Sequence, residues 1–393
     1  MTPSARVQAA IELLDSVVAA AGADGAPADR LIAEYFRARR YAGSKDRRAV
    51  RELVYRAIRA CGPVPASGRA AMLRLAEEDP SLTSLFDGSS HGPAPISPGE
   101  PFAAGGLAPA WLAAELASSG VAGEEAAALL GRAPLDVRVN TLKADRATIA
   151  LPVAAMPTDA PQGLRLEPGA PVESWEAYAD GLIEVQDTGS QLACLAVGAA
   201  PGETVIDLCA GGGGKTLALA AAMEGRGTLL ATDSDRGRLS KLTPRAERAG
   251  AGMIETRLLN PGQELAMLDE FAGAADAALV DAPCSGTGTW RRNPEARWRL
   301  SPERLARLAE VQARLLDIGA QLVRPGGRLV FVTCSLLDAE GTDQVDAFLG
   351  SHPGWTADAV DLPLGCPRGK GWRLAPFQDG TDGFFIARLS RSW

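Results

Sequence analysis

The chain has 393 residues, of which 46% are hydrophobic and 22% are charged, and its formal net charge is -8. This composition is typical of a globular protein, and the length predicts two or three domains. No apolar run is long enough to span a membrane, no signal-peptide core follows residues 1–6, and the six scattered cysteines lack the spacing of a disulfide framework or a zinc site. We therefore expect a cytoplasmic protein, acting as a monomer, that binds neither a membrane nor a metal ion.

Helices are expected over residues 5–60, because apolar side chains recur there at helical spacing. One set comprises Val7, Ile11, Leu14 and Val18, and the other comprises Val50, Leu53, Val54 and Ile58. The segment Gly43–Arg48 offers a Ser/Asp helix start between them. Residues 87–106 are rich in Gly, Pro and Ser and predict a linker, whereas residues 107–180 are mixed and begin with an amphipathic segment at Pro109–Leu112.

From Gly181 onward, predicted strands alternate with predicted helices. The strands cover residues 204–208, 227–233, 279–281, 329–332 and 384–387. An Ala/Leu-rich helix is expected from Thr216, and a basic helix is expected from Asp235. This alternation predicts an α/β fold with a doubly wound, mostly parallel sheet, whose ligands bind at the carboxyl ends of the strands.

Positive charge is concentrated in two segments although the whole chain is acidic. Residues 1–70 contain 12 Lys or Arg against 7 Asp or Glu, which leaves a net charge of +5 there and -13 in the remainder. Residues 289–307 hold six arginines, at positions 291, 292, 297, 299, 304 and 307, against two glutamates. Local basic faces contact phosphates whatever the total charge, so both segments are candidates for binding nucleic acid, with solvated helix faces as the alternative.

A glycine-rich loop follows the first strand after residue 200 and comprises Cys209, Ala210, Gly211, Gly212, Gly213, Gly214 and Lys215. Such a loop lets the backbone approach a ligand closely at a helix N-terminus. A phosphate-binding P-loop requires glycine where Cys209 stands, and four consecutive glycines fit a dinucleotide-binding loop poorly. A third interpretation is a nucleoside-bearing cofactor such as S-adenosyl-L-methionine, whose ribose hydroxyls Asp233 would bind. A purely structural turn is the remaining alternative.

Two cysteines end strand-like runs at the same predicted edge of the sheet. Cys284 follows Asp281 by three residues, and Cys334 follows the run that ends at residue 332. Two thiols beside a carboxylate predict covalent chemistry with a separate step of proton transfer or release. Methylation of cytosine at carbon 5 has these requirements, because a thiolate must add to carbon 6 and a polar group must bind ring nitrogen 3. The other cysteines, Cys61, Cys194, Cys366 and with less support Cys209, are expected to be small core residues.

Seven motifs along the chain together are characteristic of one family. They are Arg138–Asn140, Val185–Gln191, the glycine loop with Lys215, Asp281–Cys284, Arg291–Pro294, Thr333–Ser335 and Asp379–Phe385. On these residues, the chain resembles the RNA cytosine-5 methyltransferases of the RsmB type in the NOP/NSUN superfamily over nearly its whole length. The N-terminal segments Lys45–Arg48 and Leu53–Arg59 resemble a NusB-like RNA-binding domain.

The resemblance implies a class I (Rossmann-like) methyltransferase fold preceded by two smaller parts. A helical NusB-like RNA-binding domain would occupy residues 1–90, a small α+β linking subdomain residues 107–180, and the catalytic domain residues 181–393. The implied reaction transfers a methyl group from S-adenosyl-L-methionine to carbon 5 of a cytidine in RNA, with 16S ribosomal RNA as the implied substrate.

The resemblance also implies a role for each candidate site residue. Cys334 would be the nucleophile that adds to cytosine carbon 6, and Cys284 would assist release of the covalent adduct. Asp281 would bind the cytosine and touch the cofactor, and Lys215 would orient the site. The cofactor itself would be held by residues 209–215, Asp233 and Asn260. Basic faces at Arg47-Arg48, Arg236–Arg238 and Arg291-Arg292 would hold RNA phosphates.

Two positions depart from the family pattern. Gly211-Gly212 replace the usual Ala-Pro, which gives the loop one more amide donor. Asn260 stands where the family usually has an aspartate near the adenine, so it can form hydrogen bonds but carries no charge. Three alternatives remain: a DNA cytosine methyltransferase, in which the Pro-Cys thiol attacks; a tRNA cytosine-5 methyltransferase; and a non-catalytic RNA-binding or ribosome-assembly factor that retains the fold.

Overall fold

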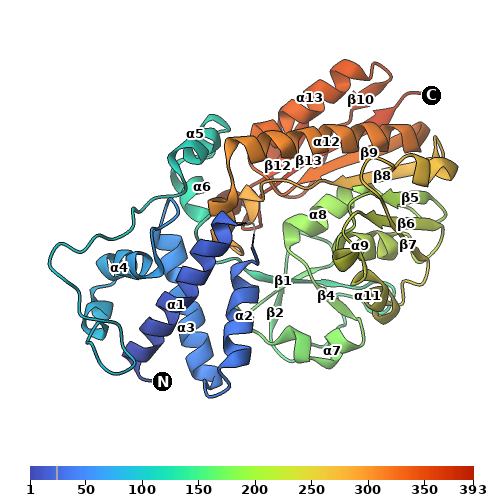
Figure 1. Ribbon diagram of the computed structural model, residues 1–393. Helices are drawn as coiled ribbons and strands as arrows, with labels where there is room; N and C mark the ends of the chain where they lie inside the picture. Colours follow the sequence, from blue (N-terminus) through green and yellow to red (C-terminus); the bar gives the residue numbers. More distant parts are fainter. Residues whose placement is uncertain (24) are drawn as a thin grey trace. The chain divides into compact units, whose positions relative to one another are not determined.

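The computed structural model describes residues 1–23 and 25–393, which form two compact units (Figure 1). Unit 1 comprises Met1–Gly131 and Thr289–Ser301, and unit 2 comprises Arg132–Gly288 and Pro302–Trp393. A short segment from late in the chain therefore belongs to the N-terminal unit, which nothing in the sequence pattern predicts.

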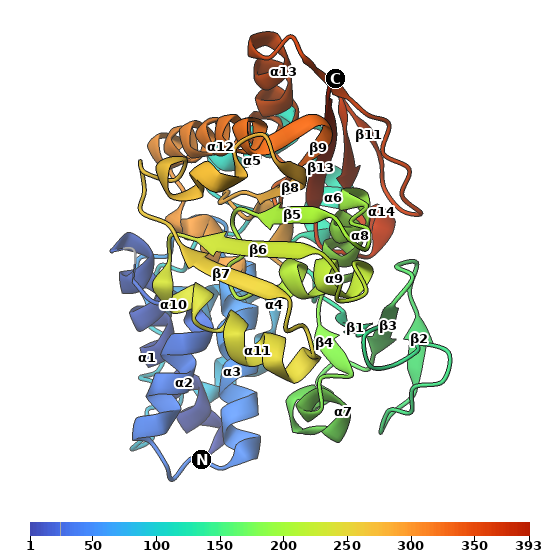
Figure 2. The same cartoon turned by 90° about the vertical axis from the view of Figure 1, so that its right-hand side faces the viewer.

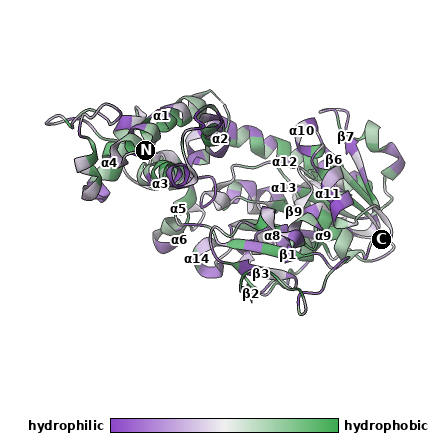
Figure 3. Cartoon of the chain, turned by 90° about the horizontal axis from the view of Figure 1, so that it is seen from below, coloured by the Kyte–Doolittle hydropathy of each residue, from purple (hydrophilic) through white to green (hydrophobic). Residues whose placement is uncertain are grey.

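Unit 1 is helical and is organised around the two apolar faces that the sequence predicts. Its helices are α1 Pro3–Gly22, α2 Ala28–Ala38, α3 Ser44–Ala60, α4 Gly68–Glu78, the 3-10 helix η1 Pro80–Leu85, α5 Ala110–Ser118, α6 Gly123–Ala128 and the 3-10 helix η5 Pro294–Arg299. Val7, Leu14, Val50, Val54 and Ile58 are fully buried in one core, because each face packs against the other. Figure 3 shows apolar and polar stretches alternating along these helices.

The ends of the unit 1 helices confirm part of the sequence prediction. Helix α3 begins at Ser44, as expected, but its N-cap is Gly43 and no side chain caps it. Asp46 instead binds the terminal amine of Met1 at 3.2 Å and the guanidinium of Arg6 at 2.9 Å. Residues 86–109, all of them described, contain no helix or strand, but they lie within unit 1 and place Ala103 in its core, so they do not link two units as the sequence predicted.

The segment Thr289–Ser301 binds the ends of two unit 1 helices. Glu295 accepts a hydrogen bond from the amide of Ala28, in the first turn of α2, at 2.9 Å. Arg297 donates to the carbonyl oxygens of Ile58 and Cys61, at the end of α3, at 2.7 and 2.6 Å. Helix ends leave amide and carbonyl groups without partners inside the helix, and this segment supplies hydrogen-bond partners to such groups at the start of α2 and the end of α3.

The arginines of residues 289–307 therefore do not form one basic face. Arg297 is fully buried and Arg291 is 7% exposed. Arg299 donates to the carbonyl oxygens of Gly25 and Ala26 at 2.7 and 2.8 Å. The interpretation of Arg291 as a phosphate-binding side chain was wrong, because that side chain is buried. The sequence does not show that the segment Thr289–Ser301 packs into the helical unit.

A small antiparallel sheet opens unit 2. Its strands are β1 Leu135–Val139, β2 Ala155–Pro157, β3 Gly163–Leu166 and β4 Ile183–Val185, in the order β2-β3-β1-β4. The 3-10 helix η2 Val172–Ser174 and helix α7 Glu176–Ala179 complete this part, whose core includes Val137, Leu164 and Trp175. The mixed character of residues 107–180 thus reflects helices of unit 1 followed by this sheet, whose last strand lies just beyond that range.

The main sheet of unit 2 has nine strands in the order β11-β12-β13-β9-β8-β5-β6-β7, with β10 paired to β13 (Figure 2). The strands are β5 Thr204–Asp207, β6 Thr228–Asp233, β7 Ile254–Leu258, β8 Ala275–Asp281, β9 Val323–Thr333, β10 Trp355–Ala357, β11 Cys366–Arg368, β12 Gly371–Leu374 and β13 Phe384–Arg391. Strands β5 to β9 are parallel, and the others are antiparallel additions at one edge. The predicted α/β fold with a mostly parallel central sheet is confirmed.

Helices cover both faces of this sheet. One face packs against α8 Thr188–Val197, α9 Gly214–Ala222, α10 Arg236–Leu239 and α11 Leu242–Ala249, and the other packs against α12 Pro302–Leu322 and α13 Thr342–Ser351. Val205 and Ile206 alternate between the two cores, as Leu279 and Val280 do. Burial on both faces explains why these strands read as continuous apolar runs.

The remaining cysteines divide between core and surface. Cys61 and Cys194 are buried, as expected. Cys366 is exposed, so its assignment to the core was wrong: it lies in β11, an edge strand with a partner on one side only. Among residues 1–23 and 25–393, no helix is both long and apolar enough to cross a membrane.

Candidate active site

A cavity of about 870 Å³ lies in unit 2 at the carboxyl ends of the parallel strands. The loops that follow β5, β6, β7, β8 and β9 all contribute to its wall, as does one face of α12. The strand order reverses between β5 and β8, which is the point where open α/β sheets bind ligands.

The glycine loop after β5 forms one side of this cavity. Cys209, Ala210, Gly211, Gly212, Gly214 and Lys215 line it. Gly213 does not: its φ is +87°, and a Cβ there would lie 2.1 Å from Leu242, so this glycine is required by packing. A Cβ on Gly211 or Gly214 would meet no atom within 4 Å, so the loop leaves open space in front of its backbone.

Asp233, at the end of β6, faces the same side of the cavity. Its Oδ2 accepts a hydrogen bond from the Gly211 amide at 2.8 Å, and its Oδ1 accepts one from the Asp235 amide at 2.7 Å. The carboxylate is therefore held in place by the backbone, and each oxygen retains a lone pair for a further donor.

Beneath the glycine loop, Asp207 ends β5 and is fully buried. Its Oδ2 accepts a hydrogen bond from the Thr216 hydroxyl at 2.7 Å, whereas its Oδ1 has no hydrogen-bond partner among the described residues. Burial raises the pKa of Asp207 to about 7, against the opposing effect of the Thr216 hydrogen bond.

Lys215 and Asp281 form an ion pair on the cavity wall, with Nζ 2.6 Å from Oδ2. Burial by itself lowers the pKa of Lys215, but the charge of Asp281 and the hydrogen bond to it raise that pKa above its usual value. The ammonium group also lies 5.5 Å from the ring centroid of Phe384. Lys215 is therefore a fixed positive charge beside the carboxylate.

The two predicted thiols meet at the cavity, with Sγ of Cys284 and Sγ of Cys334 3.3 Å apart. The hydrogen bond between them, together with burial, raises the pKa of Cys284 well above its usual value. Cys284 is thus held as a neutral thiol within hydrogen-bond distance of Cys334. Burial likewise raises the pKa of Cys209, which makes that cysteine a poor nucleophile.

A buried carboxylate, Glu340, joins the two cysteine loops. It is 0% exposed, and its Oε1 accepts from the Ser285 amide at 2.8 Å and from the Gln312 side chain at 3.0 Å. Its Oε2 accepts from the Ser285 hydroxyl, and its backbone oxygen accepts from the Thr333 hydroxyl at 3.1 Å. Ser285, next to Cys284, is therefore bonded to the Glu340 side chain, and Thr333, next to Cys334, is bonded to the Glu340 backbone.

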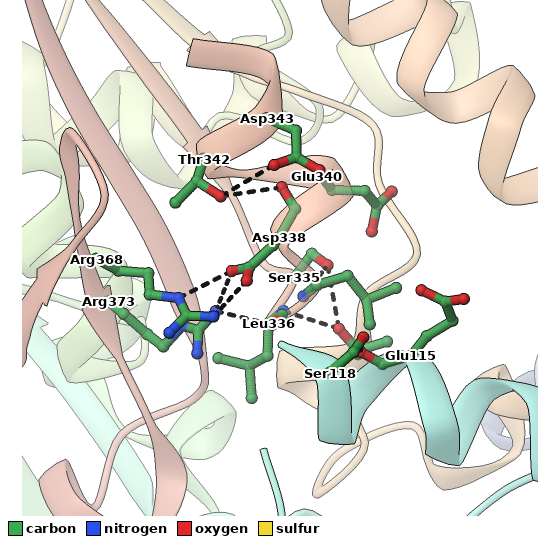
Figure 4. Close-up of polar contacts among 12 residues, drawn as sticks. Glu115, Ser118, Ser335, Leu336, Asp338, Glu340, Thr342, Asp343, Arg368 and Arg373 are labelled. Carbon is green, nitrogen blue, oxygen red and sulfur yellow. Dashed lines mark hydrogen bonds and ion pairs between the residues drawn. The ribbon is translucent and has the colours of Figure 1, made fainter. Parts of the chain in front are cut away.

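The loop that carries Glu340 is itself bound to the hairpin β11–β12. Figure 4 shows the side chains of Arg368 and Arg373 together on one side of Asp338, and both donate to its carboxylate. Arg373 also donates to the Leu336 carbonyl at 3.1 Å. Strand β9, the loop after it and the edge hairpin thus form one connected support for Cys334.

Comparison with known proteins agrees with this arrangement. The family described as 16S rRNA methyltransferase RsmB/F matches residues 194–390. The chain belongs to this family. It is 36% identical over 276 residues to the probable ribosomal RNA small subunit methyltransferase B of Synechocystis, covering 66% of this chain and 60% of that protein. It is 38% identical over 234 residues to ribosomal RNA small subunit methyltransferase B of Salmonella typhi, covering 59% and 52%.

The chain thus spans little more than half the length of the curated relatives it matches. Among solved structures, PH0851 is similar over 98% of this chain and 99% of its own, with a TM-score of 0.78 and 23% identity, which supports the fold. A methyltransferase homolog protein from Pyrococcus horikoshii has a TM-score of 0.59 and 25% identity, covering 72% of this chain and 99% of its own.

The motifs quoted from the sequence predict most, but not all, of the residues that line the cavity. Asn260 is exposed, its side chain lies 3.4 Å from that of Gln263, and the cavity is lined instead by its neighbours Leu259 and Pro261. Glu264 lines the cavity too, although no motif predicts it.

Two further residues escaped the sequence analysis. Glu340 lies six residues after Cys334, and Gln312 lies in the middle of an amphipathic helix. Glu340 lies in a stretch of the sequence that also contains Asp338 and Asp343, and acidic residues of this kind are usually solvent-exposed, so no signal marked it as buried.

Proposed function

We propose that this chain transfers a methyl group from S-adenosyl-L-methionine to carbon 5 of a cytidine in RNA, and that the RNA is 16S ribosomal RNA. The observation that carries the proposal is the pair of thiols 3.3 Å apart on a cavity shared with the Lys215–Asp281 ion pair and the glycine loop. The names of the RsmB/F relatives support the choice of substrate.

The glycine loop and Asp233 fit a nucleoside-bearing cofactor. The open space in front of Gly211 and Gly214 lets the polar end of the cofactor approach the backbone amides. The lone pairs that remain on Asp233 suit two ribose hydroxyls. Bound there, S-adenosyl-L-methionine supplies an electrophilic methyl group.

Cys334 is the nucleophile of the proposed reaction. Its sulfur gives its proton to a water molecule and adds as a thiolate to cytosine carbon 6, which makes carbon 5 electron-rich enough to take the methyl group. Asp281 binds the edge of the cytosine that carries nitrogen 3 and the amine. Lys215, held beside Asp281 at 2.6 Å, offsets the negative charge that develops on the ring.

Cys284 acts in the release step. Once carbon 5 is methylated, its proton leaves to a water molecule, and the carbon 6–sulfur bond breaks with its electron pair remaining on Cys334. The Cys284 thiol, whose pKa is raised by its hydrogen bond to Cys334 and by burial, donates a hydrogen bond to the departing sulfur. The aromatic ring is restored and the enzyme is free.

We also infer how the rest of the chain contributes. Residues 1–90 serve as a NusB-like RNA-binding domain, residues 107–180 as a linking subdomain, and residues 181–393 as the catalytic domain, in a cytoplasmic monomer. The exposed side chains of Arg47 and Arg48 in helix α3 support the first of these assignments.

The test compares Cys334→Ala and Cys284→Ala with the exposed control Cys366→Ala, using a 16S ribosomal RNA transcript and labelled S-adenosyl-L-methionine. Cys334→Ala should abolish methyl transfer and covalent adduct. Cys284→Ala should methylate but accumulate a protein–RNA species that survives denaturing electrophoresis, and Cys366→Ala should behave as wild type. Activity in Cys334→Ala, or an adduct on another residue, would overturn the mechanism; methylation of tRNA alone would overturn the substrate.

A further inference from the structure

The proposed chemistry leaves one side of the cavity without a role. This side lies at the end of β7, four strands from β9, which is roughly 15–20 Å at the usual strand spacing. Its apolar part consists of Leu259 after β7 and of Leu308, Val311 and Leu315 of α12. The three α12 residues recur at helical spacing, so one face of this helix forms a wall opposite Leu259.

An ion pair completes this wall. Glu264 lines the cavity and is 8% exposed, and its Oε1 lies 2.8 Å from the guanidinium of Arg314, which also lines the cavity. Its Oε2 accepts a hydrogen bond from the Gly262 amide at 2.8 Å. The carboxylate is therefore fixed in place, while the side chain of Arg314 remains 44% exposed and has donors to spare.

The loop after β7 offers little else with which to recognise a base. Asn260 is exposed and lies outside the cavity wall, with its side-chain amide 3.4 Å from the Gln263 side chain. Pro261 lines the cavity but has no backbone N–H to donate. Glu264 and Arg314 supply the acceptor and the donor that this loop lacks.

We propose that the Glu264–Arg314 ion pair recognises the adenine of the cofactor. Asp233 holds the ribose on β6, and the base lies in the adjoining apolar slot between Leu259 and α12. Adenine presents a donor, its 6-amino group, beside an acceptor, N1. Glu264 accepts from the amino group and Arg314 donates to N1, so the pair complements this edge; the inference rests on the proposed function.

Calorimetric titration with two cofactor analogues tests this assignment. S-adenosylhomocysteine carries the 6-amino group and N1 acceptor, whereas S-inosylhomocysteine carries a 6-oxo group and an N1–H. Wild type should prefer the adenosyl compound by tenfold or more, because the 6-oxo group would face the Glu264 carboxylate. In Glu264→Gln the preference should fall at least threefold, since an amide can turn either its donor or its acceptor to position 6 of the base, while Arg314 still opposes the N1–H.

The matched control is Glu270→Gln, which removes the charge of another ion pair after β7, Arg257–Glu270, away from the cavity wall. It should keep the wild-type preference. If Glu264→Gln keeps that preference, or loses affinity for both analogues equally, the inference is overturned while the proposed function stands. If wild type binds neither analogue, the proposed function fails as well.

A second variant covers the case in which Glu264→Gln does not fold. Arg314→Met alters a half-exposed position and removes the donor to N1 together with the ion pair to Glu264, whose carboxylate is still held by the Gly262 amide. Its affinity for S-adenosylhomocysteine should fall about tenfold, whereas its affinity for the 1-deaza analogue, which lacks the N1 acceptor, should equal that of wild type. Equal losses for the two compounds would overturn the role of Arg314.

Discussion

Single buried residues set the pH response of this protein, and Asp207 is the clearest case. Its carboxyl group has an ordinary pKa of 3.8 when exposed and one of about 7 in the folded state, chiefly because of burial. The folded protein therefore holds a proton that the unfolded chain has released across that interval. The stability that this proton provides is complete below pH 3.8 and is lost as pH rises through 7.

We predict that Asp207→Asn removes the loss of stability that wild type shows as pH rises through 7. Between pH 5 and pH 8, the free energy of unfolding of wild type should fall relative to the variant by at least about 1 kcal/mol, because each pKa unit corresponds to about 1.4 kcal/mol. Urea unfolding of wild type and Asp207→Asn at pH 5 and pH 8 measures this difference in free energy.

Asp276→Asn is the control, and its stability difference from wild type should stay constant between pH 5 and pH 8. The Thr204 amide and Arg324 outweigh burial and lower the pKa of Asp276, so that side chain stabilises the fold above its ordinary pKa and loses this effect as pH falls. A constant difference between wild type and Asp207→Asn across this pH range would contradict the assignment of the titrating group.

At the scale of elements, the segment Thr289–Ser301 supports helices that precede it by more than two hundred residues. Arg297 is fully buried and carries three carbonyl contacts, to Pro294, Ile58 and Cys61. Burial lowers its pKa to about 10, so it remains charged at neutral pH. The hydrogen bonding at the end of α3 therefore depends on a side chain that lies more than two hundred residues later in the sequence.

We predict that Arg297→Met lowers the free energy of unfolding of unit 1 by about 3 kcal/mol, since several buried carbonyl groups lose their donor. Arg30→Met is the control, because Arg30 is 70% exposed and pairs only with Glu34 along α2; it should change stability by less than about 0.5 kcal/mol. Chemical denaturation followed by circular dichroism measures both. Similar effects of the two substitutions would mean that the segment does not support the helices.

At the scale of the whole molecule, charge is unevenly distributed, and its sum does not describe what the surface binds. Residues 1–70 carry +5 within a chain of -8. Arg47 and Arg48 are exposed in α3, whereas Arg291 and Arg297 are buried. The exposed arginines of the helical unit are the ones available to phosphates.

We predict that Arg47→Glu with Arg48→Glu weakens RNA binding and lowers its salt dependence by about two phosphate contacts, because each contact releases condensed counterions. Affinity for S-adenosylhomocysteine should not change. Arg226→Glu with Lys370→Glu alters total charge equally at exposed ion pairs of unit 2 and should leave the salt slope as it was. Binding measured by filter retention from 50 to 200 mM salt distinguishes the two; equal slopes in all three proteins would contradict the prediction.

The sequence by itself determined the features that depend on short-range pattern. Strands buried on both faces are apolar runs, and helices with one buried face show apolar residues at helical spacing, so β5, β6, β8, β9 and the N-terminal helices could be located. Cys284 and Cys334 could be brought together for the same reason, since each follows a strand of one parallel sheet and such strands end at a common edge.

Only the tertiary structure decided which other residues line the cavity or support the two cysteines. No sequence pattern marks the carboxylates of Glu340 and Glu264 as buried, and their burial follows from partners on a separate element, Gln312 and Arg314 of α12. The sequence predicts that the arginines of Thr289–Ser301 form a basic surface, but this segment packs among helices of unit 1. Long-range packing leaves no periodic signal in the chain, because the contact depends on where two distant segments meet and not on the neighbours of either residue.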